Sequence, residues 1–265
     1  MVRTHHIDGV ISDNRFGLFH QNVYTIYITH QLSIRTKNKF TEILARRIHN
    51  AFINKYSECW VPDAKEGGLA GDLSHPEALP RSTTYIGPLS RFTQKTSLNF
   101  VYDLLITISG PEPQRTIFQT LILNELKSFN GKALVVLGLP GLHSIPVSHL
   151  SNVELRNHLD AREMNEAMLK SKLILSRSGY TTIMDLVKLK KKAILIPTPG
   201  QSEQEYLADY LFEKNMFYTI RQEVFSLSKA LKEVALFPFE IPELDMELYK
   251  TSLKHLIEKL RSNLI

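Results

Sequence analysis

Residues that could bind a phosphorylated sugar gather between Lys172 and Asp209. Ser178 and Gly179 stand between a short apolar run and a helical pattern, so the first free amides of a helix lie beside them, which is a ready anion site. Thr181 and Asp185 are four residues apart and share one face of that helix. A hydroxyl and a carboxylate there suit a ligand with both a phosphate and sugar hydroxyls. The alternative is a plain structural unit with solvated polar residues, because local patterns are weak evidence.

Short apolar runs place these residues at strand ends. Residues 172–176 and 193–196 have the length of buried strands, and the pattern between them has the apolar spacing of a helix. Strand, helix, strand predicts a parallel βαβ unit, and ligands of such sheets bind at the carboxyl ends of the strands. Residues 197–200 form a stiff turn, and Ser202 is the predicted N-cap of the next helix.

The same stretch resembles the donor-binding half of family 28-type glycosyltransferases. The resemblance extends loosely over residues 81–225 and implies that the segment holds a UDP-sugar. By that resemblance Asp185, where the family has Glu, binds the ribose hydroxyls, and Gln204 contacts the sugar. The residues that carry the implied donor site here are Arg177, Ser178, Gly179, Thr181, Thr182, Asp185, Gln201, Glu203 and Gln204.

The resemblance implies an α/β fold of the GT-B type, with two Rossmann-like domains built on parallel sheets. We expect a partial N-terminal, acceptor-side domain over residues 1–84 and a donor-binding domain over residues 85–240. A terminal helix in residues 241–265 is expected to pack back on the first domain. Relatives of this type carry further βα units before this segment, so the first domain is expected to be truncated or completed by a separate subunit.

The expected first domain supplies candidates for the acceptor side. Asp13, Asn14 and Arg15 follow its first strand, and His30 follows its second. Histidine is the natural general base near neutral pH, so His30 is the candidate catalytic residue. The alternatives are a histidine satisfied at a strand end and a simple polar turn. The strand and helix patterns of this domain are residues 7–12, 23–29, 39–56 and 59–62.

Two other features of this domain have definite expectations. The helix pattern at residues 39–56 has as its apolar positions Phe40, Ile43, Leu44, Ile48, Phe52 and Ile53. Residues 63–81 are rich in glycine, proline and charge and lack periodicity, so they are predicted to form a surface loop that leads to the domain boundary.

The expected donor domain opens with a second anion-site pattern. A strand at residues 102–109 ends in Ser109-Gly110-Pro111, and a helix follows from about residue 114 to 127. Relatives have a glycine-rich turn here that contacts the donor diphosphate, whereas Pro111 removes one amide donor. The alternative is an ordinary turn with proline at the helix entry. By the same resemblance, the backbone near Leu159 meets the nucleotide base.

The composition limits the chemistry. The chain has 265 residues, a formal charge of +5 and a single cysteine, Cys59, so a disulfide framework is excluded. No clustered Cys and His pattern predicts a zinc site, and no Asp-x-Asp motif follows a strand. We therefore expect transfer without a metal or a cofactor other than the UDP-sugar co-substrate. The resemblance implies inversion at the anomeric carbon.

The sequence also restricts the partners. Lys188 and Lys190–Lys192 form a basic cluster at a helix end, where they complement the helix dipole or contact a membrane surface. The second reading has support because acceptors in the family are often lipid-linked. Basic residues are not interleaved with aromatic ones, so nucleic acid is not an expected partner. Without an apolar leader pattern or a membrane-length apolar run, the expected location is cytoplasmic, with a peripheral contact at the inner face of the membrane.

These patterns favour transfer of a hexose or N-acetylhexosamine from a UDP-sugar to an unknown acceptor. One alternative is a donor-binding subunit or inactive fragment that needs a partner. Another is a UDP-sugar epimerase or hydrolase on the same fold. A third is a Rossmann-like binder of a different nucleotide, although the absence of a GxGxxG turn after a strand counts against NAD.

Overall fold

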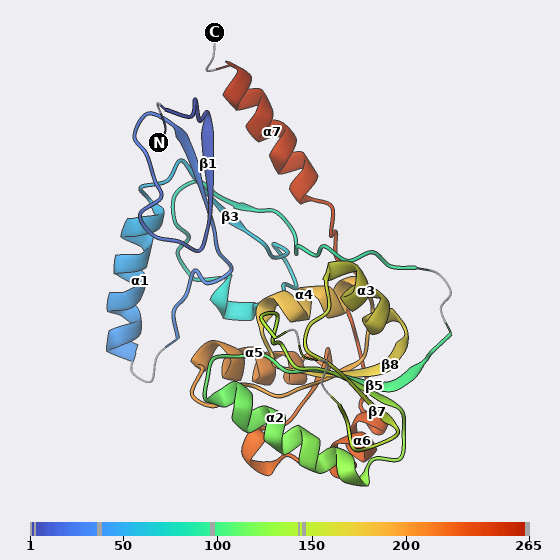
Figure 1. Cartoon of the computed structure of the whole chain (residues 1–265). Helices are drawn as coiled ribbons and strands as arrows, with labels where there is room; N and C mark the ends of the chain where they lie inside the picture. Colours follow the sequence, from blue (N-terminus) through green and yellow to red (C-terminus); the bar gives the residue numbers. More distant parts are fainter. Residues whose placement is uncertain are drawn as a thin grey trace. The chain divides into compact units, whose positions relative to one another are not determined.

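The chain forms two compact units, drawn as a ribbon in Figure 1. The computed structural model describes residues 2, 4–35, 39–95, 99–142, 144 and 147–262. Unit 1 contains Met1–Leu89 and Leu244–Ile265, and unit 2 contains Ser90–Glu243. The boundary expected at residue 85 falls at the end of a strand of unit 1, a few residues before this division.

Unit 2 is built on a six-stranded parallel sheet with the order β10-β9-β8-β5-β6-β7. The first strand of this unit, β5, lies in the middle of the sheet, and β6 and β7 follow toward one edge. The chain then returns to the middle to form β8 beside β5, and β9 and β10 follow toward the other edge. This is the Rossmann order, and its switch point lies between β5 and β8. The strands are β5 (Tyr102–Thr107), β6 (Ala133–Val136), β7 (Val153–Arg156), β8 (Ser171–Ser176), β9 (Ala193–Leu195) and β10 (Tyr218–Thr219).

Helices cover both faces of this sheet. Figure 1 shows α2 and α6 on one side and α3 and α4 on the other. The α-helices are α2 (Gln114–Glu125), α3 (Ala161–Leu169), α4 (Tyr180–Lys188), α5 (Ser202–Glu213) and α6 (Leu227–Leu236). Short 3₁₀ turns are η2 (Leu126–Ser128) and η3 (Gln222–Val224). Because both faces are covered, the strands β6 and β9 are continuous, fully buried apolar runs without a polar alternation.

Two helices of unit 2 differ in how their first turns are capped. Before α3, Asp160 and Glu163 form a reciprocal capping box, with Asp160 Oδ1 accepting from the Glu163 amide at 2.8 Å. The prediction that Ser202 caps α5 is wrong, because the N-cap is Gln201 and it makes no side-chain capping bond. Glu203 and Glu205 do lie in the first turn, where they complement the helix dipole.

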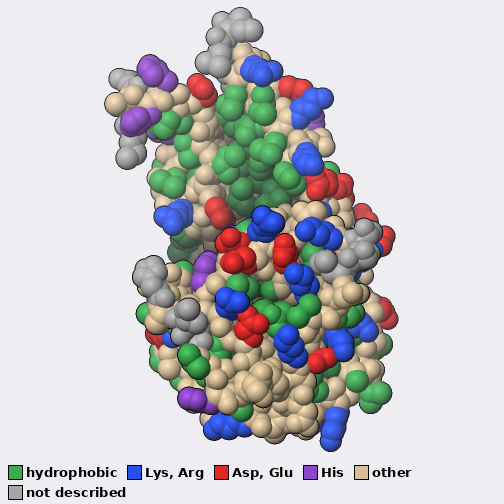
Figure 2. All heavy atoms as spheres, turned by 45° about the vertical axis from the view of Figure 1, so that its right-hand side comes forward, with side chains coloured by type: hydrophobic (Ala, Val, Ile, Leu, Met, Phe, Trp, Pro, Cys, Tyr) green, Lys and Arg blue, Asp and Glu red, His purple; other side chains and the backbone are tan. Residues whose placement is uncertain are grey.

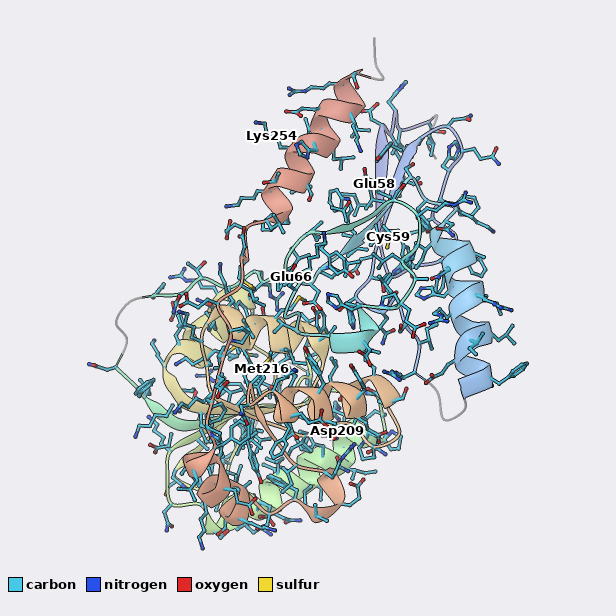
Figure 3. All side chains as sticks on the ribbon, turned by 180° about the vertical axis from the view of Figure 1, so that it is seen from behind. Glu58, Cys59, Glu66, Asp209, Met216 and Lys254 are labelled. Carbon is cyan, nitrogen blue, oxygen red and sulfur yellow. The ribbon has the colours of Figure 1, made fainter. Side chains whose placement is uncertain are left out.

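Unit 1 is built on a four-stranded parallel sheet with the order β1-β2-β3-β4. Its strands are β1 (Gly9–Asp13), β2 (Tyr24–Ile28), β3 (Glu58–Val61) and β4 (Thr83–Tyr85). Side chains alternate between the two faces, so Cys59 and Glu58 point to opposite sides of β3 (Figure 3). The sequence did not predict β4, because three half-exposed residues carry no usable periodicity.

Helix α7 (Tyr249–Ser262) covers one face of the unit 1 sheet. It lies within residues 241–265, where a terminal helix was expected, and its Leu256 packs with Ile26 and Trp60. Lys259 forms an ion pair with Glu58 of β3. Between β1 and α7 lies a groove of about 310 Å³ with mainly apolar walls. Figure 2 shows hydrophobic side chains gathered on a face of this unit.

Helix α1 (Lys39–Ile53) turns its apolar face outward. Leu44 and Ile48 are each 51% exposed, and Phe40 is 74% exposed. Of the apolar positions in the sequence pattern, Ile53 is the buried one, while His49 on the opposite face is also buried. We call the exposed side chains of Phe40, Ile43, Leu44, Ile48 and Phe52 the α1 stripe.

The segment after β3 is ordered around one buried carboxylate. Asp63 accepts hydrogen bonds from the amides of Leu69 at 2.7 Å and Ala70 at 3.0 Å, and from the Ser74 hydroxyl at 2.6 Å. Leu69, Ala70 and Leu73 of η1 (Gly71–Leu73) are fully buried. The prediction of a surface loop is therefore wrong for this part of residues 63–81.

No helix among the described residues has both the length and the hydropathy that a membrane crossing requires.

Candidate functional site

The candidate site lies at the carboxyl edge of the unit 2 sheet, around its switch point. β5 and β8 are neighbours and parallel, so the loops that follow them begin side by side. Gly179 is the N-cap of α4 and makes no side-chain capping bond. A Cβ added at Gly179 would meet no atom within 4 Å, so the space in front of this helix N-terminus is open. Such a helix end can accept an anion.

The turn after β5 also has room for a ligand. Ser109 and Gly110 are exposed, and Gly110 has φ +108°, a conformation that suits glycine. A Cβ at Gly110 would lie 3.7 Å from Thr198 Oγ1. The turns after β5 and β9 are therefore close to each other at this edge.

Arg177 is buried at the end of β8 and ties several loops together. Its Nη1 donates to the Pro197 carbonyl oxygen at 3.0 Å, and its Nη2 donates to Gln222 Oε1 at 2.6 Å. The guanidinium carbon lies 3.8 Å from the centre of the Phe118 ring. Burial lowers the pKa of this guanidinium to about 10. Most of the donors of Arg177 thus serve the loops, whereas the resemblance implied a place for Arg177 in the donor site.

Three buried polar atoms at this edge have no hydrogen-bond partner among the described residues: Gln114 Oε1, Arg177 Nε and Thr198 Oγ1. Gln114 begins α2, Arg177 directly follows β8, and Thr198 follows β9. The Arg177 guanidinium also donates to the main-chain oxygen of Gln114 at 3.4 Å, so these segments meet. Because an unpaired buried polar atom is costly, each of these three atoms suits a partner from water or a ligand, and we call the three together the polar niche.

Asp185 lies on α4 and is buried. Its Oδ1 accepts a 2.6 Å hydrogen bond from the hydroxyl of Ser90. Burial raises the pKa of the Asp185 carboxyl, while the bond from Ser90 and the charge of Arg91 act in the opposite direction. The sequence placed Asp185 on a polar face with Thr181, but Thr181 is exposed while Asp185 is not.

Gln204 fixes the turn after β9. Its Oε1 accepts from the Thr198 amide at 2.9 Å, and its Nε2 donates to Gln201 Oε1 at 2.6 Å. Ser178 is fully buried, and its hydroxyl donates to the Gln204 carbonyl oxygen at 2.8 Å. The structure thus brings together Ser178, Gln201 and Gln204 from the two predicted loops. Glu203 lies beside them in the first turn of α5.

Two further residues of the predicted donor site, Thr182 and Leu159, are half-buried. Thr182 is half-buried in the first turn of α4. Leu159 is half-buried just before the capping box of α3, after β7. Their predicted contacts with a nucleotide stay predictions.

The acceptor-side candidates lie at the carboxyl edge of the unit 1 sheet. Asp13 ends β1, and the Asn14 side chain accepts a 2.9 Å hydrogen bond from the Tyr27 hydroxyl. The main-chain oxygen of Arg15 accepts from the Tyr56 hydroxyl at 3.0 Å, so the turn is fixed by side chains of its own unit. His30 follows β2 and is half-buried.

The predicted lysine cluster is engaged within unit 2. Lys191 donates to the main-chain oxygens of Leu169 and Ser171 at 2.7 and 2.9 Å. Lys190 forms an ion pair with Glu243, and Lys192 lies over the ring of Phe239. These contacts agree with the structural alternative for the cluster.

Sequence reasoning missed Gln114, Thr198 and Asp63. Thr198 lay within the predicted turn, and its place after a strand was a usable signal. The role of Asp63 had no local signal, because its partners are main-chain amides up to seven residues away. Among the described residues, no group of three or more His, Cys, Asp or Glu side chains is placed to hold a metal ion.

Comparisons with known proteins agree with this geometry. Residues 149–260 match the Glycosyltransferase family 28 C-terminal domain. A curated protein of Desulforamulus reducens is 25% identical over 144 residues, which cover 49% of this chain and 38% of that protein. It is a UDP-N-acetylglucosamine--N-acetylmuramyl-(pentapeptide) pyrophosphoryl-undecaprenol N-acetylglucosamine transferase. The match thus spans well under half of that relative.

Solved structures share the fold at low identity. The glycosyltransferase of kitacinnamycin has a TM-score of 0.60 and 12% identity, with 98% of this chain and 73% of that chain covered. MurG of Acinetobacter baumannii has a TM-score of 0.53 and 10% identity, with 98% and 75% covered. The UDP-GlcNAc 2-epimerase of Neisseria meningitidis has a TM-score of 0.61 and 15% identity, with 97% and 78% covered.

The two parallel sheets and these matches define an α/β protein with the GT-B fold. Within that fold, the similarity to glycosyltransferase family 28 lies in residues 149–260, which match the C-terminal domain of that family.

Proposed function

We propose that unit 2 binds a UDP-sugar and that the chain transfers its hexose or N-acetylhexosamine to an acceptor hydroxyl with inversion. The observation that carries the proposal is the open, glycine-capped N-terminus of α4 at the Rossmann switch point. Three buried polar atoms without partners among the described residues lie at the same edge of the sheet. An anion site and a polar niche together suit a nucleoside diphosphate ligand.

The donor roles follow from the positions of the residues. The amides at the start of α4 and the Ser109-Gly110 turn would hold the diphosphate, since both flank the switch point. Asp185 would accept from the ribose hydroxyls, and Gln201 and Gln204 would contact the sugar. Arg177 would hold these loops in place through its carbonyl contacts.

Transfer requires the acceptor oxygen to attack the anomeric carbon while the bond from that carbon to the diphosphate oxygen breaks. UDP leaves with the bonding electrons, and the amides at the helix end stabilise the charge that develops on it. The proton of the acceptor hydroxyl passes to a base, for which His30 is the candidate. No metal or cofactor other than the UDP-sugar is required by this scheme.

The acceptor is proposed to be lipid-linked, with a peripheral membrane contact at the inner face of the membrane. The curated relative has a pyrophosphoryl-undecaprenol acceptor in its name. In this chain, the α1 stripe presents apolar side chains beside the exposed cation Arg47, which is the composition of an interfacial helix. We therefore place the proposed contact on α1, since the lysine cluster is engaged within unit 2.

Calorimetric titration of the chain with UDP, UDP-N-acetylglucosamine, ADP and GDP tests the donor site. Selective binding of the uridine nucleotides is expected. Equal affinity for all four nucleotides, or binding of none of them, would contradict the proposed UDP-sugar site. Product analysis with UDP-N-acetylglucosamine then separates transfer from hydrolysis and epimerisation, because a hydrolase releases free sugar and an epimerase changes the sugar.

A second candidate is a donor-binding subunit that needs a partner polypeptide. The edge strand β1 pairs with β2 on one side, and Ile11 of β1 is 48% exposed beside the groove against α7. This edge suits a further parallel strand from a partner. A chain that binds UDP but produces neither transfer nor hydrolysis by itself would favour this candidate.

A further inference from the structure

His49 lies on the inner face of helix α1, within unit 1. Its side chain is 4% exposed, and neither of its ring nitrogens has a hydrogen-bond partner among the described residues. The proposed transfer does not involve this residue. Because buried polar groups in proteins are nearly always paired, a buried imidazole without a partner calls for a physical explanation.

The contacts of His49 are with aromatic rings. Its ring centroid lies 5.4 Å from that of Phe16, on the segment after β1, and 6.2 Å from that of Tyr27, on β2. In both pairs the ring planes cross at 81°. Burial lowers the pKa of the imidazole below its ordinary value of 6.5. Aromatic rings are weak acceptors for an N–H group, so these surroundings favour the neutral form of His49.

Helix α1 is attached to its sheet by few buried side chains. Among residues 40–53 of this helix, His49 and Ile53 are the two that are buried. Ile53 packs in a cluster with Tyr27 and Cys59, whereas the α1 stripe is exposed. Figure 1 shows α1 on one side of the strands of unit 1 and α7 on the other. His49 is therefore half of the buried attachment of α1.

The titratable groups on the sheet side of His49 supply no negative charge. The Tyr27 hydroxyl donates to Asn14 Oδ1 at 2.9 Å, and burial is the main reason why its pKa is raised. Burial also raises the pKa of the Cys59 thiol to about 12. The Tyr56 ring lies 5.1 Å from the Tyr27 ring, and its hydroxyl donates to a main-chain oxygen. Tyr27 and Cys59 thus stay neutral near pH 7.

The charged side chains near this contact are Asp13 and Arg15, on the segment after β1, and Glu42 and Arg46, on α1. Asp13 and Arg15 are exposed, and the two residues of α1 are half-buried. None of the four supplies a hydrogen-bond partner to either ring nitrogen of His49, since both nitrogens are unpaired in the described part of the chain. Arg46 lies three residues before His49 on the helix, where its charge opposes a second positive charge.

We propose that protonation of His49 releases helix α1 from the sheet of unit 1, which makes α1 a pH-sensitive element. An imidazolium between these rings would be a buried charge without an acceptor, and such a charge is stabilised when it reaches water. His49 lies on the inner face of α1, so it reaches water when the helix moves away from the sheet. The inference does not depend on the proposed donor site.

The pH range follows from the direction of the pKa shift. Packed α1 binds the proton of His49 less readily than released α1, so acid favours release. The attachment should be complete above the ordinary pKa of 6.5 and should weaken until the pH has fallen through the lowered value. One proton is involved, so each pH unit in this range changes the ratio of released to packed α1 by up to about tenfold. The carboxyl of Glu58 titrates below 4.5, in a separate range.

The test is hydrogen-exchange mass spectrometry of the full chain from about pH 7.5 to about pH 5, with rates corrected for the intrinsic effect of pH. Peptides of α1 should lose protection in acid, while those of β3 and α2 should keep it. His49→Phe retains an aromatic ring that does not titrate, and it should abolish the loss. His255→Gln, at an exposed histidine of α7, is the control within unit 1 and should behave as the unaltered chain.

An NMR titration of the His49 ring in the unaltered chain provides a readout that requires no variant to fold. We expect His49 to be protonated below pH 6.5, in the same range in which α1 loses its protection. Protonation of His49 while α1 stays protected would overturn the proposal. An unchanged pH dependence in His49→Phe, or simultaneous loss of protection throughout unit 1, would overturn it as well.

Discussion

The hydroxyl of Ser90 donates a 2.6 Å hydrogen bond to Oδ1 of Asp185, so the first residue of unit 2 is bound to helix α4. Ser90 Oγ in turn accepts from the Phe92 amide at 3.1 Å. The carboxylate proposed to bind ribose is thus held by a hydroxyl far away in the sequence.

This pair gives the first prediction. Asp185→Ala should weaken UDP binding about tenfold, because it removes an acceptor for ribose hydroxyls. Ser90→Ala should leave most of that affinity and cost about 1 kcal/mol of stability, because it removes one hydrogen bond. Calorimetry and thermal unfolding measure the two effects. Unchanged UDP affinity in Asp185→Ala would exclude Asp185 from the donor site.

Arg177→Lys should destabilise unit 2 and impair UDP binding. The substitution keeps the charge but loses the planar fork that bonds Pro197, Gln114 and Gln222. We expect a loss of about 2 kcal/mol or more in the free energy of unfolding, since buried carbonyl groups lose their donors. Denaturant unfolding measures the loss, and Arg162→Lys, at an exposed position, is the control. Equal stability of the two variants would contradict the structural role of Arg177.

Stability should fall in acid through Glu58. Burial alone would raise the pKa of this carboxyl, but hydrogen bonds from Lys259, Tyr24 and Trp60 lower it below its ordinary value. The stabilisation is therefore present above the ordinary pKa of 4.5 and is lost as the pH falls through the lowered value in the folded state. Melting temperatures of the unaltered chain and Glu58→Gln should differ at pH 7 and converge in acid. A constant difference would refute this linkage.

Asp63→Asn should disorder the loop after β3. The carboxylate accepts hydrogen bonds from the main-chain amides of Ala64, Leu69 and Ala70 and from the Ser74 hydroxyl. The side chain of Asn has an NH₂ group in place of one acceptor oxygen, so some of these groups would lose their acceptor and face another donor. We expect a cost of about 3 kcal/mol, typical of a broken buried network. Thermal unfolding checks it, with Glu66→Gln as the control in the same loop. A shift no larger than that of the control would show that other contacts hold the loop.

The α1 stripe gives a membrane prediction. Leu44→Ser and Ile48→Ser should each weaken binding to vesicles of phosphatidylglycerol by about 1–2 kcal/mol, because an apolar side chain is lost from the contact. Leu236→Ser is the control, because Leu236 is an 88% exposed leucine of unit 2. Vesicle sedimentation measures binding. Identical sedimentation of all three variants would remove α1 as the membrane contact.

The sequence predicted most strands and helices of unit 2, since its buried strands are short apolar runs between clear turns. It predicted that residues 172–176 and 193–196 form one parallel unit, and β8 does pair with β9, but it did not predict the order of the other strands. The contact between β5 and β8 joins residues about 70 positions apart, as in the pair Leu104 and Leu173. Such partners depend on the whole sheet, and local patterns do not contain them.

Helix α1 and Asp63 show two other limits. Periodicity identified the apolar residues of α1 that share a face, but it does not say toward what that face turns. Asp63 organises its loop through main-chain amides, and a main-chain donor is the same for nearly every residue type. In the donor site, the glycine-capped loop was recognisable, while the niche around Thr198 and Gln114 required the fold.

The order in which the chain is synthesised affects how its two units fold. Residues 90–243 of unit 2 are contiguous, whereas unit 1 needs both residues 1–89 and residues 244–265. On the ribosome, unit 2 is complete before α7 exists, so it can fold while the face of the unit 1 sheet around Ile26 and Trp60 is still uncovered. Nascent unit 1 is therefore the part of the chain most exposed to aggregation and to chaperones.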